Sequence, residues 1–369
     1  MSKTGSEANE SGSRNMEPGS PKMEPQRKNP LHGAMRWLPG VIISGIAIYA
    51  IFSLVSPAEL VKSLQSINLI YVLPAAALFV LWLILRAVAL KVILSGKAQT
   101  LQTFRAINAG YLLNNILPLR AGEFGKAIIL GQTSGLGVTK VLSGIVIERA
   151  FDLFYAAAML LSVLPLVLEM NWTKPVAIIV LALVIAGLFA LYIMARNREP
   201  ITRWIEKIGK KRAWVCKYIQ PQIASFLGGF SILTDLKQFL VCLLAIGSSW
   251  FVAIFLYYIL MLAIITPPPL WWGVFVNSVL AMGIALPSAP AALGVFEASV
   301  VAALKVLGVD YSHALAYAIV MHFLQIAITS IFGVYGLVKE KLSLQGIFKL
   351  STRFGRKNEA DREITRCEE

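Results

Sequence analysis

Long apolar runs alternate with short polar segments along this chain from Trp37 onward. Six of these runs approach the roughly 20 apolar residues that a helix needs to cross a bilayer. They are Trp37–Val55, Ile70–Leu90, Leu142–Leu168, Val176–Met194, Leu240–Leu262 and Leu315–Leu337. The pattern predicts an all-α polytopic membrane protein with six full transmembrane helices.

Two further apolar stretches, Phe104–Leu130 and Leu270–Val306, are interrupted by Pro and Gly near their middles. Each part on either side of an interruption is short for a spanning helix. We therefore predict that each stretch forms a re-entrant hairpin of two half-helices. The predicted hairpin breaks contain Pro118 in the first stretch and Pro287, Pro290 and Gly294 in the second.

The two broken stretches occupy matching places in the two halves of the chain. Asn108 stands ten residues before Pro118, and Asn277 stands ten residues before Pro287. Broken helices at corresponding positions are typical of inverted-repeat transporters whose binding site lies near the bilayer midplane. We predict a membrane domain at 36–338, with repeat one at 36–170, repeat two at 174–338 and a basic loop at 195–238.

Composition supports the membrane assignment, because 57% of the residues are hydrophobic and only 15% are charged. The net charge of +14 could suggest a nucleic-acid partner, but the positions of the basic residues argue against one. With both termini inside, 27 of the 34 Lys and Arg residues lie in cytoplasmic segments, and only Lys62 and Lys174 lie outside. We predict an integral protein of the cytoplasmic membrane with both termini cytoplasmic and no nucleic-acid partner.

The polar ends and the basic loop carry weaker signals. The segment 1–35 is polar and lacks an apolar face, which predicts a disordered cytoplasmic tail, and 339–369 is expected to form a second cytoplasmic tail. The basic loop interleaves Trp204 and Trp214 with Lys and Arg. That pattern fits either an interfacial helix on anionic lipid or a solvated connector.

Nine charged residues fall within apolar segments and need an explanation. A charge at the centre of a membrane helix costs about 2.5–3.5 kcal/mol. Most of these charges must therefore pair or face a watery cavity, which predicts a polar site inside the helix bundle. The acidic residues are Glu123, Glu148, Asp152 and Glu297, and the basic residues are Arg86, Arg120, Lys126, Arg149 and Lys305.

The first break and the helix after it combine residue types that bind phosphate. Arg presents a planar fork to phosphate, Lys adds a point charge, and a helix N-terminus offers free N–H groups. We predict a lipid-headgroup or phosphate site made by Asn115, Arg120, Gly122, Lys126 and Arg149. Alternatively, Arg120 and Lys126 extend to the cytoplasmic surface, and Arg86 near its helix end is open to the same interpretation.

The acidic residues have two open interpretations. Glu148 and Asp152 share a helix face, and Arg149 can reach Asp152, which suits either a structural lock or a headgroup site. Glu297 is either a helix cap or a proton-binding carboxylate. Likewise, His322 is either structural or a proton relay, so Glu123, Glu148, Asp152, Glu297 and His322 are predicted to balance charge or couple an ion.

In this order the motifs resemble the lysylphosphatidylglycerol synthase transmembrane, or flippase-like, family over roughly Leu38–Leu337. The matching motifs are Asn115-x-x-Pro118-x-Arg120-x-Gly122-Glu123-x-x-Lys126, Glu148-Arg149-x-x-Asp152, and Pro287-x-x-Pro290-x-x-x-Gly294-Val295-Phe296-Glu297 followed by Leu307-Gly308-Val309. The resemblance implies a lipid flippase domain, which in the bacterial multiple peptide resistance factor precedes a soluble aminoacyl-transferase domain. We expect this chain to be a stand-alone form without that transferase.

We therefore expect transbilayer movement of a phosphate-bearing lipid by alternating access and no enzyme activity. Expected partners are membrane lipids, either anionic phospholipid or polyprenyl phosphate carrying a glycan, together with a lipid-modifying enzyme. No cofactor or metal site is expected, because the Cys and His residues lack ligand spacing. Two alternatives stay open: a membrane-embedded transferase or accessory subunit of a polyprenyl-phosphate glycosyltransferase, and a secondary solute or ion transporter.

Overall fold

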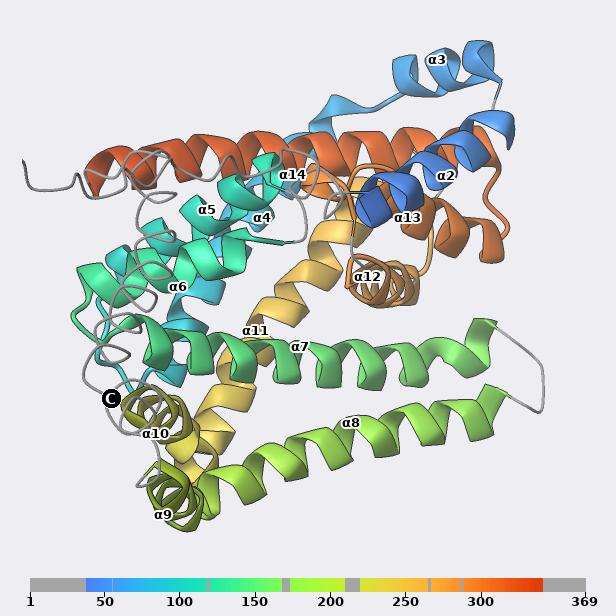
Figure 1. Ribbon diagram of the computed structural model, residues 1–369. Helices are drawn as coiled ribbons and strands as arrows, with labels where there is room; N and C mark the ends of the chain where they lie inside the picture. Colours follow the sequence, from blue (N-terminus) through green and yellow to red (C-terminus); the bar gives the residue numbers. More distant parts are fainter. Residues whose placement is uncertain are drawn as a thin grey trace, which may run out of the picture. The chain divides into compact units, whose positions relative to one another are not determined.

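The computed structural model describes residues 38–54, 56–117, 120–167, 173–209, 220–264, 267–285 and 288–340, and every regular element in these ranges is a helix (Figure 1). The all-α prediction is confirmed for this part of the chain. The predicted tail at 1–35 lies outside the described residues, as do 341–369, Pro118 and Pro287.

Among the described residues, four helices are long and apolar enough to cross a membrane. They are α4 (Leu69–Ile93), α7 (Val138–Val167), α11 (Leu236–Met261) and α14 (Tyr311–Lys339), and each contains most or all of one predicted span. The other two predicted spans coincide with α2 (Leu38–Leu54), of 17 residues, and α8 (Thr173–Arg196), of 24 residues. A membrane crossing by α2 or α8 stays a prediction.

Both broken stretches form pairs of shorter helices. The first pair is α5 (Thr100–Ile116) and α6 (Gly122–Thr133), and the second is α12 (Trp271–Gly283) and α13 (Val295–Val306), with the short η3 (Pro290–Ala292) before α13. The two helices of each pair pack against each other. Passage of each pair in and out through one membrane face stays a prediction.

At each break, residues other than glycine adopt an unusual backbone conformation. Arg120 has φ +55°, and Ala291 and Ala292 have φ +56° and +58°, a left-handed conformation that non-glycine residues rarely adopt. Gly294, with φ +80°, directly precedes α13, where an added Cβ would lie 2.7 Å from the carbonyl oxygen of Ser44 in α2. The break predicted at Gly294 is therefore a place of close backbone approach as well as a turn.

Helices of the two halves pack in a reciprocal way. α4 contacts α11, α5 of the first half contacts α14 of the second, and α12 of the second half contacts α7 of the first (Figure 1). Glycines bring α14 close to α5: an added Cβ on Gly333 would lie 2.7 Å from the Asn108 carbonyl oxygen, and one on Gly336 would lie 2.7 Å from that of Arg105. Small residues allow the same close approach between membrane helices generally.

The outer helix faces carry many exposed large apolar side chains. Ile70 is 78% exposed and Phe323 is 71% exposed, and similar side chains occur on α8, α11 and α14. Such a surface suits contact with lipid rather than water.

The remaining described elements are α3 (Pro57–Gln65), α9 (Arg198–Gly209), α10 (Gln220–Gly229) and η2 (Phe230–Thr234). The predicted basic loop therefore contains helices on both sides of 210–219. Because the Trp204 side chain and residue Trp214 lie outside the described part, placement of this loop on the lipid surface stays a prediction.

Candidate functional site

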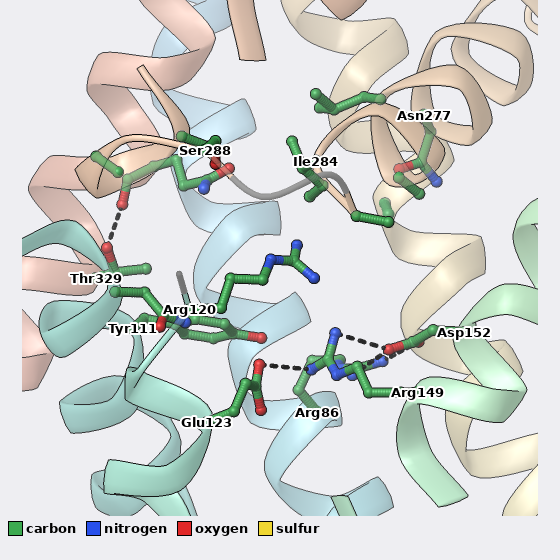
Figure 2. A pocket seen from close by; sticks show the side chains of 18 of the residues that line it. Arg86, Tyr111, Arg120, Glu123, Arg149, Asp152, Asn277, Ile284, Ser288 and Thr329 are labelled. Atoms are coloured by element: carbon green, nitrogen blue, oxygen red, sulfur yellow. Dashed lines mark hydrogen bonds and ion pairs between the residues drawn. The ribbon is translucent and has the colours of Figure 1, made fainter. Parts of the chain in front are cut away.

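A cavity of about 460 Å³ lies between α4, α5, α7, α11, α12 and α14 (Figure 2). Its volume falls in the range of roughly 300–1,000 Å³ that small-molecule sites occupy. Three arginines, Arg86, Arg120 and Arg149, line it, together with Glu123 and Asp152. Five of the seven charged residues that the sequence predicted in the first half are therefore gathered around one space.

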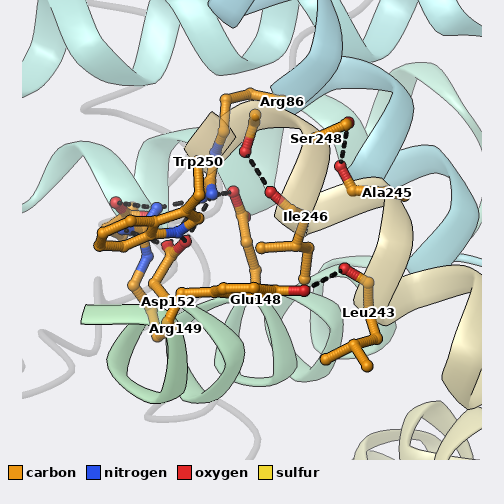
Figure 3. A network of polar contacts seen from close by, with 12 residues as sticks. Arg86, Glu148, Arg149, Asp152, Leu243, Ala245, Ile246, Ser248 and Trp250 are labelled. Atoms are coloured by element: carbon orange, nitrogen blue, oxygen red, sulfur yellow. Dashed lines mark hydrogen bonds and ion pairs between the residues drawn. The ribbon is translucent and has the colours of Figure 1, made fainter. Parts of the chain in front are cut away.

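Arg86 forms the centre of the ion-pair network. Its Nη1 donates to Asp152 Oδ1 at 2.6 Å and its Nη2 donates to Asp152 Oδ2 at 2.8 Å and also to Glu148 (Figure 3). The side chain is only 3% exposed. The interpretation that Arg86 extends to the cytoplasmic surface is wrong, because two carboxylates of α7 hold its guanidinium inside the bundle.

Trp250 of α11 completes the binding of Asp152. Its indole Nε1 donates to Asp152 Oδ1 at 3.0 Å. Asp152 therefore receives hydrogen bonds from α4 and α11 while it lies on α7. The network joins three of the four described helices that are long and apolar enough to span the membrane.

Lys126 lies behind the cavity wall. Its Nζ is 2.9 Å from Glu123 Oε2 and donates to Glu148 Oε2 at 3.1 Å, and the side chain is buried. Lys126 and Glu148 do not belong to the cavity lining. In this conformation Lys126 neutralises carboxylates, so a direct contact between Lys126 and a phosphate would require rearrangement.

Arg149 faces the cavity while still paired. Its Nη1 lies 3.2 Å from Asp152 Oδ2 and its Nη2 lies 3.4 Å from Glu123 Oε1. The Nε and Nη2 groups make no hydrogen bond to a described residue. Both atoms are buried, so a ligand oxygen would reach them only after the side chain moves.

Arg120 differs from the other cations of the site. It lines the cavity, and no ion pair or hydrogen bond joins its side chain to a described residue. Figure 2 shows its guanidinium apart from the Arg86–Asp152 pair, with no dashed line to another residue drawn. With Arg86, Lys126 and Arg149, it makes four cations against the three carboxylates Glu123, Glu148 and Asp152, which leaves one net positive charge.

Gly122 and Asn115 have structural contacts. The Gly122 N–H donates to Asn114 Oδ1 at 2.7 Å, and a Cβ at Gly122 would lie 2.0 Å from the Gly110 carbonyl oxygen. Asn115 lines the cavity, but its Nδ2 donates to Thr329 Oγ1 at 3.1 Å and to Ser330 Oγ at 3.3 Å. Gly122 therefore allows α6 to pack on α5, and Asn115 joins α5 to α14.

The second break contains a buried acid–base pair. Glu297 Oε2 accepts from the Gly294 N–H at 2.7 Å, and its Oε1 lies 2.5 Å from His322 Nδ1. The His322 Nε2 lies 2.8 Å from the Ala291 carbonyl oxygen. The two sequence interpretations of Glu297 are thus compatible, because one oxygen caps α13 while the other meets a titratable group.

A profile described as lysylphosphatidylglycerol synthase TM region matches residues 37–333. The chain belongs to this family. It is also similar to a UPF0104 membrane protein of Methanothermobacter thermautotrophicus, with 27% identity over 189 residues, which cover 46% of this chain and 54% of that protein. The chain thus matches about half the length of that curated relative, and no solved structure matches it.

Membership of the lysylphosphatidylglycerol synthase transmembrane family confirms the resemblance seen in the motifs. Together with the apolar helices, it identifies an integral membrane protein whose family is associated with lipid. The family match covers all the charged residues described above, from Arg86 to His322.

The contacts of Arg86 and Trp250 with the carboxylates of α7 were not predicted from the sequence of this family member. Arg86 had a usable signal, because a cation inside an apolar helix requires a partner, and Glu148 with Asp152 provided one carboxylate more than Arg149 could neutralise. Trp250 gave no such signal, since a Trp in an apolar span is typical of ordinary hydrophobic packing.

Proposed function

We propose that this chain moves a phosphate-bearing lipid between the leaflets of its membrane. The observation that carries the proposal is the net positive charge of the cavity, which comes from Arg120 having no partner among the described residues. An uncompensated charge in a membrane interior is costly, so such a site favours an anionic ligand. The lipid tails would remain in the bilayer while the headgroup crosses through the cavity.

The charged residues divide into ligand contacts and supports. Arg120 and Arg149 contact the phosphate, because both line the cavity, Arg120 has no partner among the described residues, and Arg149 Nε makes no hydrogen bond to one. Arg86 and Lys126 hold Glu148, Asp152 and Glu123 in place around them. This assignment keeps the predicted roles of Arg120 and Arg149 and moves Lys126 to the supporting group.

Alternating access is the proposed mode of movement. The reciprocal packing of α5 on α14 and of α12 on α7 is the arrangement that two halves related by an internal two-fold axis would produce. Rocking of one half against the other would then open the cavity first to one leaflet and next to the other. The proposed orientation keeps both termini on the cytoplasmic side, in the cytoplasmic membrane.

The Glu297–His322 pair is the proposed coupling site for a proton. A carbonyl oxygen only accepts, so the contact to Ala291 requires a hydrogen on His322 Nε2. The contact between His322 Nδ1 and Glu297 Oε1 then needs one proton between the two atoms. Loss of that proton would remove this hydrogen bond and so disturb the His322 ring, whose Nε2 contacts Ala291, a cavity-lining residue.

The test is lipid movement in proteoliposomes, measured by dithionite quenching of an acyl-labelled fluorescent phosphatidylglycerol. Arg120→Ala should lower the protein-dependent rate at least tenfold while the yield of inserted protein stays normal. Arg105→Ala is the matched control, because Arg105 pairs with Glu340 away from the cavity. Full activity of Arg120→Ala, or equal losses in both variants, would contradict the proposal.

A further inference from the structure

The two ends of the cavity differ in charge. The charged lining residues come from α4, α6, α7 and the turn before α6. The lining contributed by α12, the following turn and α14 is uncharged and includes Asn277, Ser288, Gln325 and Thr329. Figure 2 shows Asn277 and Ser288 at the opposite end of the lining from Arg86 and Glu123.

Asn277 is the unusual member of the uncharged end. The residue is 7% exposed, and its Nδ2 has no hydrogen-bond partner among the described residues. A buried polar group without a partner is unfavourable, so one that lines a ligand cavity is expected to receive its partner from the ligand. A side-chain amide both donates and accepts, which suits a hydroxyl group.

The uncharged end also disfavours a cation. The carboxylates among the cavity-lining residues are Glu123 and Asp152, and both are already paired with arginines. A headgroup amine placed near Asn277 would therefore find no free carboxylate among the described lining residues. It would also add charge to a cavity that already has one net positive charge.

We infer that the cavity selects a monoanionic phosphodiester lipid with a neutral, hydroxyl-bearing headgroup, and that Asn277 binds a headgroup hydroxyl. The inference rests on the proposed lipid function and narrows it. The phosphodiester neutralises Arg120, while the headgroup extends toward Asn277 and Ser288. A cationic lysyl headgroup, which the family description names, is disfavoured in this chain.

Three lipids with identical acyl chains separate these features: phosphatidylglycerol, phosphatidylethanol and lysylphosphatidylglycerol. The first two are monoanionic phosphodiesters that differ in headgroup hydroxyls, and the third adds amines. Binding of each to the purified full chain in detergent is measured by native mass spectrometry. Phosphatidylglycerol should bind roughly three- to tenfold more tightly than phosphatidylethanol, the factor expected of a hydrogen bond, and lysylphosphatidylglycerol more weakly than both.

Substitutions at Asn277 test the subsite directly. Asn277→Leu should remove the preference for phosphatidylglycerol and leave phosphatidylethanol binding unchanged. Asn277→Ser should retain part of the preference, since a hydroxyl also donates and accepts. Asn277→Asp places a carboxylate at the uncharged end and should raise the relative binding of lysylphosphatidylglycerol at least tenfold.

The outcomes distinguish this inference from the proposed function. If Arg120→Ala weakens binding of all three lipids but the unsubstituted chain binds them equally, the headgroup inference fails and the phosphate site stands. If Arg120→Ala changes none of them, the proposed function fails. A preference for phosphatidylglycerol that survives both Asn277→Leu and Asn277→Asp would overturn the role of Asn277 alone.

Discussion

The two helix breaks place an acid and a base in the same arrangement. In the first, Glu123 is the second residue of α6 and pairs with Arg149 on α7; in the second, Glu297 is the third residue of α13 and meets His322 on α14. Each acid begins a half-helix, and each base lies on the next long helix. The difference is that an Arg side chain keeps its charge, whereas a His side chain has both a neutral and a charged form.

The surroundings of the two pairs increase this difference. The first pair adjoins Arg86 and Lys126, which fix the carboxylates of α7 and α6 in charged form. The described residues around the second pair supply no further ion-pair partner, and His322 instead stacks on Phe296 with ring centroids 4.1 Å apart. The first half therefore contains a fixed site, in which the partners of the carboxylates keep their charge. The second half contains a variable site, in which the charge of the partner can change.

The largest effect is expected from removing the central cation of the fixed site. Arg86→Leu leaves Asp152 and Glu148 without their main partner, and breaking a buried ion pair in this way costs about 3–5 kcal/mol. The apparent Tm in detergent and the folded fraction in size-exclusion chromatography should both fall sharply. Arg105→Ala, at the more exposed pair with Glu340, should change Tm little. Equal stability of the two variants would refute a fixed site centred on Arg86.

A smaller effect is expected where the first break depends on close packing. Gly122→Ala would place a Cβ 2.0 Å from the Gly110 carbonyl oxygen, and such overpacking costs about 1–3 kcal/mol. Gly187→Ala in α8 is the control, because nothing lies within 4 Å of its added Cβ. A decrease in Tm for both variants, or for neither, would show that α5–α6 contact does not limit stability.

The variable site is tested by its response to a pH gradient. Glu297→Gln keeps an oxygen that can accept from the Gly294 N–H but cannot ionise. If the pair carries a coupling proton, this variant should bind lipid and lose any acceleration of lipid movement by an imposed gradient. Glu123→Gln, at the equivalent place in the first break, should retain the gradient response. A normal gradient response in Glu297→Gln would show that Glu297 acts only as a helix cap.

The smallest effect is expected at the start of α14. It tests whether a pH response comes from this helix end or from the second break. Asp310 caps this helix; burial raises the pKa of its carboxyl, but hydrogen bonds from His313 and Ser312 outweigh burial and lower it overall. Its contribution to stability is therefore present above the unfolded pKa of about 3.9 and is lost as pH falls through the lower folded pKa.

Asp310→Asn, which keeps a capping oxygen but cannot ionise, should consequently lower Tm slightly between about pH 5 and pH 8, and this difference should shrink as the pH falls below the unfolded pKa. The gradient response should stay normal. Loss of the gradient response in this variant would assign that response to the start of α14 and remove it from Glu297 and His322.

Hydropathy predicted the helix positions well, because length and apolar content decide whether a segment can form a membrane helix. The interruptions near Arg120 and Gly294 were also predictable from Pro and Gly. The left-handed conformations of Ala291 and Ala292 were not, since alanine gives no local signal for positive φ. A tertiary contact accompanies them, between His322 Nε2 of α14 and the Ala291 carbonyl oxygen.

The partners within the candidate site were harder to predict than its members. Arg86 and Asp152 are 66 residues apart, and only the packing of α4 and α7 brings them together. The pairing of Glu297 with His322 was accessible in principle, because the two pairs stand at nearly the same separation along the chain: 173 residues from Arg149 to His322 and 174 from Glu123 to Glu297. If Glu123 is expected to meet Arg149, the repeat suggests that Glu297 meets His322.

Arg120, which has no partner in the described part of the chain, has a consequence for the return half of a transport cycle. A cavity with one excess positive charge closes more readily around an anion than around nothing, because the anion removes a net charge from a region of low dielectric. After releasing one lipid, the protein would switch back most easily with another anion in its place. Such behaviour is exchange, and it would bring lipid populations of the two leaflets toward equilibrium unless a proton or another driving ion enters the cycle.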